Sequence, residues 1–523
     1  GRFRVALGGR ALDRTFGIGP SEWHWADGGT VALEKGRLRV ALRDEDGFDG
    51  RCAGIVLTDD GSRPTGALKP SDAAVDETHD FDFVVVGLPG TCAAVAAARR
   101  GLKVALVQDR PVLGGNASSE IRVWCGGEAR YPLVRELRGW FLNRDHNLAL
   151  SDAHRMRVVE DERNLSVFLR HRVFAAETAA DGKGRRIVAA RALDWGNDRV
   201  VSFRAPLFCD ATGDGWLGFY SGADWSMGRE AASVYGETFA PQKGDGLTLG
   251  ASIMWTSAVA NTDFPFSAPW AEPHACGEAA VCGEWNWEYG MRRNMIDEAE
   301  HIRDRLFLAV YGAFSLAKKD SANARRVLDN VPFLLGKRES RRLLGDWVYT
   351  EKDVTQKRLF EDAVASGSWS VDLHYDDCKP GVDFLTTCRQ PHYGRYWIPY
   401  RSIYSRNVEN LFVVGRCFSC SHVGLGGARV INTLSQLGVA AGEAATLCHA
   451  RAFLPRDVHA KGLGRMLQRI LGGDFPGNPD PERMRWTVVD DESPGVEIGS
   501  GWIVGHNPNG EQVGDISHFP AGC

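Results

Sequence analysis

Hydrophobic and polar positions alternate with a period of two over much of the first 78 residues, and glycines separate the alternating stretches. The clearest case is TVALEKGRLRVALRDEDGFDGRCAGIVLTDDG, residues 30–61. Such alternation is typical of half-buried strands joined by turns. It predicts three or four antiparallel strands, so residues 1–78 are interpreted as a β-rich accessory module. The polar stretch 60–80 is predicted to be the linker that follows.

The pattern changes from Phe81 onward. A short apolar run at 83–86 is followed by a helix of small residues at 92–100 and a second apolar run at 103–107. A strand, a helix and a strand in this order predict a parallel sheet with a right-handed crossover. Residues 165–210 return to strand-like alternation, which predicts a small antiparallel meander that feeds a last buried strand.

Later segments add helices of two kinds. The region 250–400 is rich in Trp and partly helical, with its longest helical pattern at 294–319. A long helix of small residues is predicted within 429–450, and a shorter one at 466–471. Residues 485–506 alternate again and predict strands near the C-terminus.

Composition excludes some partners. The chain has 523 residues, of which 62 are basic and 67 acidic, and a net charge of -5. No basic field is available for nucleic acid, so no nucleic-acid partner is expected. No apolar run is long enough to span a bilayer. The chain is therefore expected to be soluble, and either cytoplasmic or, after removal of a signal peptide, periplasmic or secreted.

Twelve cysteines in a chain of this length do not indicate a disulfide framework. The closest pair, Cys417 and Cys420, has three interpretations: a redox dithiol, two metal ligands, or two small buried residues. The last is favoured, because no second pair lies nearby to complete a zinc site. No metal site is predicted.

The segment VVVGLPGTCAAVAAARRG, residues 84–101, is typical of the strand, turn and helix that open a dinucleotide-binding domain. A diphosphate needs backbone N–H groups at a helix N-terminus and no side chain in the way. Gly87 and Gly90 supply a G-x-x-G turn in place of the usual G-x-G-x-x-G. Gln108 ends the second strand, where its amide oxygen can accept bonds from ribose hydroxyls. A purely structural turn is the alternative.

Three further segments change this picture. RPVLGGNASSEIR (110–122) follows the second strand, CDATGDG (209–215) ends a buried strand, and NLFVVGR (410–416) leads through SHVGLGGARV (421–430) into a helix. Each places glycines and small polar groups after a strand, where a backbone can approach a cofactor closely. Together these segments are far more specific than the first turn alone.

With GKRESRRLLGDWV (336–348), WSVDLH (369–374) and YWIPYRSIY (396–404), these motifs resemble bacterial FAD-dependent oxidoreductases of the glutathione-reductase and fumarate-reductase type over roughly residues 80–475. Some members of that group are labelled xanthan-lyase-like, which is a weak link to carbohydrates. Family members generally read V-V-V-G-G-G-x-x-G-T at the first turn, so this chain lacks two residues there, among them the middle glycine.

The resemblance implies an α/β fold, with a doubly wound FAD-binding domain at 79–215 and 406–480. A substrate domain of α+β type would occupy 216–405, and a β-rich segment 481–523. The implied FAD contacts match the family motifs residue by residue: Gly87 and Gly90 at the turn, Gln108 at the ribose, Gly114, Gly115, Asn116 and Ser118 in the flavin-side loop, Val173 on the adenine-side strand, Thr212, Gly213 and Asp214 at the second dinucleotide contact, and Gly415 with Arg416 at the late flavin contact.

Hydride transfer from an alcohol requires a base for the hydroxyl proton. His422 is the first candidate, in a glycine-rich loop after the Gly415 strand, although it is equally well explained as a residue that stabilises this loop. Arg429, at the start of the next helix, is a candidate clamp for a carboxylate or the flavin edge, with an internal salt bridge as the alternative.

Two further motifs supply second-tier candidates. The charges of 336–348, including Glu339 and Arg341, indicate either an anionic substrate site or, preferably, an internal ion-pair network at a domain junction. Asp372 and His374 lie on one face if their segment is extended, and His374 is a candidate for assisting proton transfer.

Aromatic residues of the same region are candidates for a sugar-sized cleft, although more of them are expected in the core: Trp285, Trp287, Trp369, Tyr393, Tyr396 and Trp397. The predicted function is an FAD-dependent oxidoreductase that moves a hydride between flavin N5 and a small polar substrate, with a carbohydrate secondary alcohol as one candidate. Two alternatives remain: a flavin-depleted carbohydrate-binding protein on the same scaffold, and a flavin-dependent reductase of an activated alkene. The oligomeric state stays open.

Overall fold

The computed structural model divides the chain into two compact units, Gly1–Asp72 and Ala73–Cys523. The predicted boundaries at 215, 405 and 480 stay predictions. The residues that the structure describes are 2–18, 24–36, 38–45, 52, 54–63, 74–87, 89–138, 148–180, 184–283, 287–375, 387–472, 475–476, 495–499, 502–506 and 512–515.

The described part of the first unit holds an antiparallel sheet in the order β2-β1-β3. Its strands are β1 Phe3–Leu7, β2 Arg10–Ala11 and β3 Val40–Asp44. Alternate residues of β1, namely Phe3, Val5 and Leu7, form a small core. The alternation thus corresponds to burial in β1, whereas β3 is mostly exposed, with Val40 44% and Leu42 52% exposed.

A five-stranded parallel sheet is the centre of the second unit, in the order β22-β11-β5-β6-β7. Its strands are β5 Phe83–Gly87, β6 Val104–Val107, β7 Leu165–Phe168, β11 Leu207–Ala211 and β22 Leu411–Val413. After β5 the chain adds β6 and β7 on one side of β5, and later β11 and β22 on the other side. The strand order thus reverses between β5 and β11, and ligands bind in the crevice at such a switch point in open α/β sheets. The predicted α/β class is confirmed.

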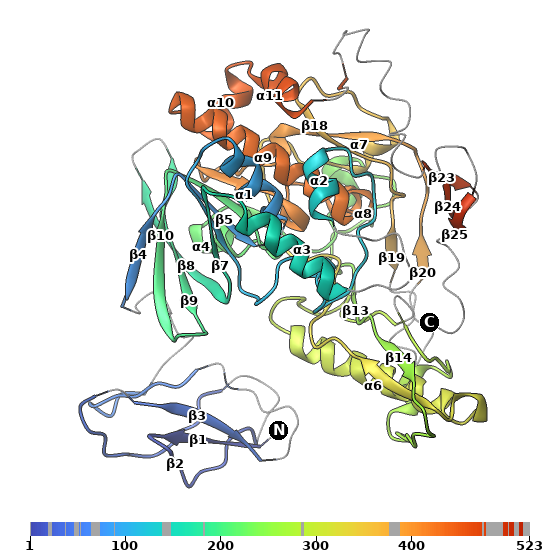
Figure 1. The fold of residues 1–523 in the computed structure, drawn as a ribbon. Coiled ribbons are helices and arrows are strands. Elements are labelled where there is room, and N and C mark those ends of the chain that lie inside the picture. The colour runs from blue at the N-terminus through green and yellow to red at the C-terminus, as the bar shows by residue number, and fades with distance from the viewer. Residues whose placement is uncertain are drawn as a thin grey trace. The chain divides into compact units, whose positions relative to one another are not determined.

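Helices cover one face of this sheet, and a mostly antiparallel sheet covers the other (Figure 1). Phe83 and Val85 of β5 pack with α1 Gly90–Arg99 and α9 Ile431–Arg451. Val84 and Val86 point to the opposite face and pack against the sheet β4-β10-β9-β8. Both faces are buried, so the strand reads as a continuous apolar run.

Two strand predictions are corrected by this arrangement. Glu77–Asp80, predicted to be the end of the linker, is strand β4 and pairs in parallel with β10 Arg199–Arg204. Leu165–Phe168, predicted to open the antiparallel meander, instead pairs in parallel with β6. The antiparallel part consists of β10 with β8 His171–Ala180 and β9 Arg185–Asp194. Which neighbour a short strand pairs with depends on contacts distant in sequence.

The predicted substrate region contains short strand pairs and its own core around Trp255, Trp287, Ile302 and Phe314. Its helices and strands are α4 Trp216–Ser221, β12 Trp225–Ser226, α5 Ala232–Tyr235, β13 Ala251–Ser252, β14 Thr256–Val259, α6 Ala299–Ala317, β15 Arg326–Asn330, β16 Gly336–Lys337, β17 Arg342–Leu343, α7 Glu351–Thr355, β18 Ala363–Gly367, β19 Leu373–Tyr375, β20 Thr387–Arg389 and β21 Tyr396–Pro399. The elements outside it are α2 Pro132–Leu137, α3 Leu148–Glu160, α8 His422–Ala428, α10 Pro455–Ala460, α11 Gly464–Leu471, β23 Gly495–Gly499, β24 Trp502–His506 and β25 Gln512–Asp515.

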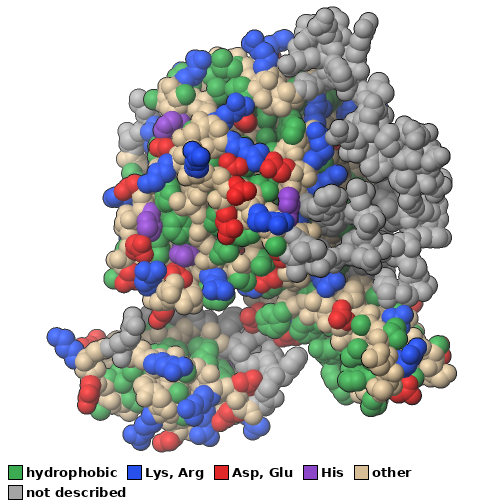
Figure 2. All heavy atoms as spheres, viewed as in Figure 1, with side chains coloured by type: hydrophobic (Ala, Val, Ile, Leu, Met, Phe, Trp, Pro, Cys, Tyr) green, Lys and Arg blue, Asp and Glu red, His purple; other side chains and the backbone are tan. Residues whose placement is uncertain are grey.

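Acidic and basic side chains are interspersed over the described residues on the face drawn in Figure 2. That mixture agrees with the near-balance of charges in the sequence. No helix in the described part of the chain is long and apolar enough to cross a membrane.

Candidate functional site

Three strand ends that are distant in sequence meet at the switch point of the parallel sheet. Gly87 ends β5 with φ +94°, and a Cβ atom on it would lie 2.5 Å from the carbonyl carbon of Ala211 at the end of β11. Gly415 follows β22 with φ +81°, and a Cβ atom there would lie 2.7 Å from Cγ of Pro89. Glycine is required at both positions by conformation and by space. The predicted first turn and late contact are therefore neighbours.

Gly90 begins helix α1 and also lacks room for a side chain. A Cβ atom on Gly90 would overlap the side chain of Val85 and lie 3.1 Å from Cβ of Ala211. Pro89 is the N-cap, and no side chain caps the helix. The N-terminus of α1 therefore keeps backbone N–H groups for an anion.

A polar network surrounds Asp214 beside this turn. Lys337 Nζ lies 2.8 Å from Asp214 Oδ2, Ser340 donates a hydrogen bond of 2.7 Å to Oδ1, and Arg416 Nη2 lies 3.5 Å from Oδ1. Burial raises the pKa of Asp214, but Lys337 and Arg416 outweigh it and bring the pKa to about 2. A Cβ atom on Gly213 (φ +75°) would lie 2.8 Å from Arg416 Nη2, so this glycine makes room for the guanidinium.

The predicted flavin-side loop is held in place by its own side chains. Asn116 Nδ2 donates to the Lys337 carbonyl at 3.0 Å, and Ser118 Oγ donates to the Gly115 carbonyl at 2.7 Å. A Cβ atom on Gly114 (φ +123°) would lie 2.7 Å from Arg155 Nη1. These polar groups shape the loop, so a cofactor would meet mainly its backbone.

The remaining predicted cofactor residues are buried or half-buried. Thr212 donates to Asp210 at 2.8 Å and accepts from the Trp216 amide at 2.9 Å, which fixes the loop after β11. Val173 packs between the two sheets, and Gln108 is 2% exposed at the end of β6. Contact of these residues with FAD stays a prediction.

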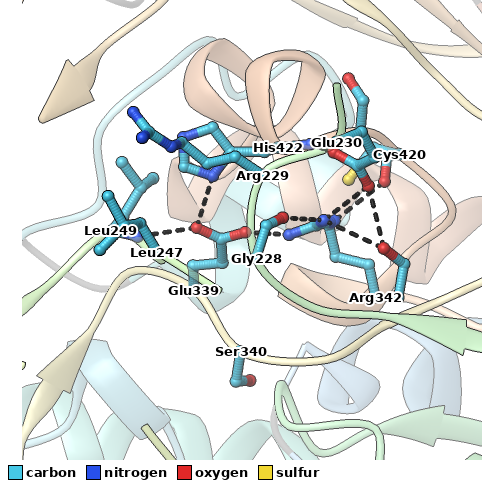
Figure 3. Close-up of polar contacts among 12 residues, drawn as sticks. Gly228, Arg229, Glu230, Leu247, Leu249, Glu339, Ser340, Arg342, Cys420 and His422 are labelled. Carbon is cyan, nitrogen blue, oxygen red and sulfur yellow. Dashed lines mark hydrogen bonds and ion pairs between the residues drawn. The ribbon is translucent and has the colours of Figure 1, made fainter. Parts of the chain in front are cut away.

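His422 belongs to a buried network, here called the His422 cluster, together with Glu339, Arg342 and Glu230 (Figure 3). His422 Nδ1 lies 2.9 Å from Glu339 Oε2, which also accepts from the Leu249 amide at 2.7 Å. Arg342 Nη1 pairs with the other oxygen of Glu339, and its Nη2 lies 2.8 Å from Glu230 Oε1. The Glu230 carboxylate in turn accepts from the His422 amide at 2.9 Å. Both carboxylates therefore share one guanidinium.

The imidazole of His422 is held in its neutral form. Burial, followed by the charge of Arg342, lowers the pKa of His422 to about 3. Its Nδ1 is engaged by Glu339, whereas Nε2 makes no hydrogen bond to any described residue. A neutral ring with one nitrogen fixed by a carboxylate and the other unengaged has the form of an oriented general base.

A second group, here called the His374 cluster, contains His374, Asp372, Glu288, Arg429 and Arg338. His374 Nδ1 pairs with Glu288, and its Nε2 lies 3.1 Å from Asp372 Oδ1. Arg429 pairs with Asp372, and Arg338 Nη1 lies 3.6 Å from Glu288 Oε1. The charge of Arg429 keeps the pKa of Asp372 well below its usual value despite burial. Because carboxylates engage both ring nitrogens, His374 is not arranged to accept a proton from a substrate.

The two clusters are adjacent but separate. Arg338 and Glu339 are consecutive, and each contacts the segment before β13: Arg338 donates to the Gly250 carbonyl at 3.1 Å, while Glu339 accepts from Leu249. Arg341 joins neither cluster. Its guanidinium stacks on Phe219 at 4.0 Å and Trp216 at 4.7 Å. Lys337, Arg338, Glu339 and Arg342 of the charged motif form internal ion pairs, in line with the preferred interpretation, and a role of the motif in substrate binding stays a prediction.

The glycine-rich stretch around His422 is helical, which corrects the predicted loop. Ser421 caps α8 by accepting from the Gly424 amide at 2.9 Å, and His422 is the first helical residue. A side chain on Gly424 would overlap the carbonyl of Tyr349, so tight packing accounts for glycine there. Arg429 is the C-cap of α8, before α9 begins, rather than the start of a helix.

Several members of the clusters are not identifiable from sequence patterns. Glu230 and Glu288 enter through contacts across 50 or more positions, for example Glu288 with His374 at a separation of 86. Arg342 lies in the charged motif 336–348, but its contact with Glu230 is not readable from the sequence. The one available signal is an acidic residue beside a Trp in the Trp-rich region, as at Glu288. That signal identifies no partner.

Most of the predicted cleft aromatics contribute to packing. Tyr396 and Trp287 are buried, Trp369 contacts Trp124 edge to face, and Trp397 lies under the Arg130 guanidinium. Trp285 lies outside the described residues. Cys417 and Cys420 are free thiols, both fully buried, as the favoured interpretation has it.

Residues 82–471 match a family described as FAD dependent oxidoreductase. A segment of 84 residues is 39% identical to glycerol-3-phosphate dehydrogenase 2 from Mycobacterium bovis. The match covers 14% of this chain and 14% of that relative's length. Among solved structures, a geranylgeranyl bacteriochlorophyll reductase-like protein from Thermoplasma acidophilum is 12% identical with a TM-score of 0.33, covering 75% of this chain and 83% of that one. A flavocytochrome c3 fumarate reductase is 13% identical with a TM-score of 0.32, covering 72% and 79%.

TM-scores of this size carry no argument about function. The family match is different, because it covers most of the chain and includes the strand ends at the switch point. The chain therefore belongs to the FAD dependent oxidoreductase family, and its cofactor is FAD.

Proposed function

We propose that the enzyme oxidises a hydroxyl group of a small polar substrate, with His422 as the base and FAD as the hydride acceptor. The observation that supports this most is the neutral His422 ring, with Nδ1 held by Glu339 and Nε2 making no hydrogen bond to a described residue. Its α8 helix follows the Gly415 turn in the same segment of chain.

The residues at the switch point fit FAD. The N-terminus of α1 has no side-chain cap and lies against Gly415, and two buried groups, Thr91 Oγ1 in α1 and Arg416 Nη1 after Gly415, have no hydrogen-bond partner among the described residues. Gly87, Gly213 and Gly415 carry no side chain, so a cofactor can approach the backbone closely at these positions. These groups would hold the dinucleotide, and the bound flavin would supply a hydride acceptor at N5.

His422 would take the hydroxyl proton at Nε2 as the C–H bond is broken. Its low pKa makes it a weak base, but the Glu339 carboxylate beside Nδ1 stabilises the imidazolium that forms. Arg342 and Glu230 hold Glu339 and the start of α8 in position. Glu339 is accordingly a positioning residue.

The protonation state of His422 favours oxidation over the alkene-reductase alternative. Reduction of an activated alkene needs a group that donates a proton, and a ring with a pKa of about 3 carries no extra proton at neutral pH. The short match to a glycerol-3-phosphate dehydrogenase supports a hydroxyl-bearing substrate. A carbohydrate secondary alcohol remains one proposed substrate, and Arg429, held by Asp372, remains a proposed clamp for an acidic group.

The pH profile provides one test. Because the pKa of His422 is lowered to about 3, the base stays neutral from pH 8 down to pH 5, and the rate of flavin reduction should change little across that range. An imidazole with an ordinary pKa near 6.5 would lose most of its activity below that value. Stopped-flow reduction of the FAD enzyme at a series of pH values measures this. A steep fall between pH 7 and 6 would show that the titrating base has an ordinary pKa, and would contradict the lowered pKa of His422.

The purified protein tests the proposal directly. We expect flavin absorbance, or its appearance after addition of FAD, and anaerobic bleaching by a polyol, sugar or hydroxy acid from a panel. Bleaching only by external reductants, followed by reoxidation with an activated alkene, would support the reductase alternative. A colourless protein that takes up no FAD but binds sugars would support the carbohydrate-binding alternative.

A further inference from the structure

Arg416 is a cation at the switch point whose hydrogen-bonding capacity is only partly used. Its side chain is 14% exposed, and Nη2 lies 3.5 Å from Asp214 Oδ1, at the limit of a hydrogen bond. Nη1 is buried and has no hydrogen-bond partner among the described residues. A buried guanidinium N–H without an acceptor is costly, so an acceptor from a ligand is expected there.

Asp214 does not neutralise Arg416. Its carboxylate is held more closely by Lys337, at 2.8 Å, and by the Ser340 hydroxyl, at 2.7 Å. One carboxylate thus faces two cations, and Lys337 is the closer of the two. A Cβ atom on Gly213 would lie 2.8 Å from Arg416 Nη2, so glycine at this position makes room for the guanidinium.

The N-cap of α1 offers no backbone donor. Pro89 is the N-cap of α1 and has no N–H group, and its ring packs against Gly415, one residue before Arg416. The hydroxyl of Thr91, in the first helical turn and 5% exposed, also lacks a partner among the described residues. The N-cap of α1 thus lies beside Gly415, and both Thr91 in the first turn of α1 and Arg416 after Gly415 keep a buried polar atom without a partner among the described residues.

We propose that Arg416 is the principal anion partner of the FAD diphosphate in this chain and compensates for the shortened Gly87-to-Gly90 motif. A guanidinium forms two parallel hydrogen bonds with phosphate oxygens, which a proline-capped turn does not offer. The N-terminus of α1 and Thr91 would bind the second phosphate. This assignment depends on FAD as the cofactor and is independent of the role of His422.

Binding measurements with three ligands distinguish recognition of the diphosphate from recognition of the flavin. Titration calorimetry or fluorescence with FAD, ADP and riboflavin probes the whole cofactor, a diphosphate without flavin, and a flavin without phosphate. In Arg416→Gln, we expect FAD and ADP to bind about 10- to 100-fold more weakly, as for loss of a charge-assisted hydrogen bond, with riboflavin binding unchanged. Arg416→Lys keeps the charge but loses the planar guanidinium. Its affinities for FAD and ADP should lie between those of the unchanged protein and those of Arg416→Gln.

Arg204→Gln is the matched control, because Arg204 forms an exposed pair with Asp80. It should leave all three affinities unchanged. Circular dichroism and urea unfolding establish that each variant is folded. FAD affinity within twofold of the unchanged protein in folded Arg416→Gln would overturn the proposal. Equal losses for riboflavin and FAD would also overturn it, since they would indicate a structural role.

Pro89→Ala tests the compensation itself. Pro89 has φ -56° and ψ -15°, which alanine adopts without strain, and the substitution restores one N–H group and removes the ring from Gly415. We expect FAD to bind about fivefold more tightly, as for one added hydrogen bond, and the effect of Arg416→Gln to be smaller in this background. An undiminished effect of Arg416→Gln would show that Arg416 does not compensate for the turn.

Discussion

Replacing His422 by Gln should slow anaerobic reduction of the bound flavin about 10²- to 10⁴-fold, the usual contribution of a general base. Glutamine can still hydrogen-bond to Glu339 but cannot accept the substrate's proton. The flavin content of the purified variant should be unchanged, because the predicted FAD contacts lie on other residues. Stopped-flow absorbance with the substrate found in the panel measures the rate.

His374→Gln is the informative comparison for this variant. Both ring nitrogens of His374 are engaged by carboxylates, so its replacement should affect the rate less than replacement of His422. If His374→Gln gave the larger loss at equal flavin content, the base would lie in the His374 cluster. An unchanged rate in His422→Gln would remove His422 from the mechanism.

Replacing Arg342 by Met should lower the free energy of unfolding by about 3–5 kcal/mol, the cost of removing one partner from a buried ion pair. Arg342 is completely buried and serves both Glu339 and Glu230. It also donates to the carbonyls of Cys420, at 3.0 Å, and Gly228, at 2.7 Å. Urea unfolding followed by fluorescence measures the difference.

Two further variants show whether the loss of stability comes from the buried ion pairs of Arg342. Arg204→Met removes an exposed ion pair and should change stability far less. Adding Glu339→Gln to Arg342→Met should restore part of the loss, because it removes one of the carboxylates left without a cation. If the double variant were less stable than Arg342→Met by the full effect of Glu339→Gln alone, the two side chains would not be coupled.

The order and type of the first α/β elements were predictable because their signals are local. The helix predicted at 92–100 is observed at Gly90–Arg99, and both flanking strands lie where the apolar runs place them. The partner of Leu165–Phe168 was not predictable, because a four-residue strand fits a parallel or an antiparallel neighbour equally well.

The candidate site was predictable only in its residue types. His422 and Glu339 were identified separately, but their hydrogen bond joins positions 83 apart. The helix around His422 was missed because glycines disfavour helices in general, and here the Ser421 cap and the close approach of Tyr349 override that preference. Tertiary packing therefore determined what local propensity did not.

The strand order β22-β11-β5 has a consequence for how the enzyme matures. During synthesis, β5 and β11 emerge from the ribosome long before β22, because residues 212–410 lie between them. Gly415 and Arg416 come later still, so a nascent chain that has folded its first strands lacks one wall of the crevice. FAD is thus expected to bind only after translation is nearly complete. By contacting both the early and the late segments of the domain, the bound cofactor would stabilise their association.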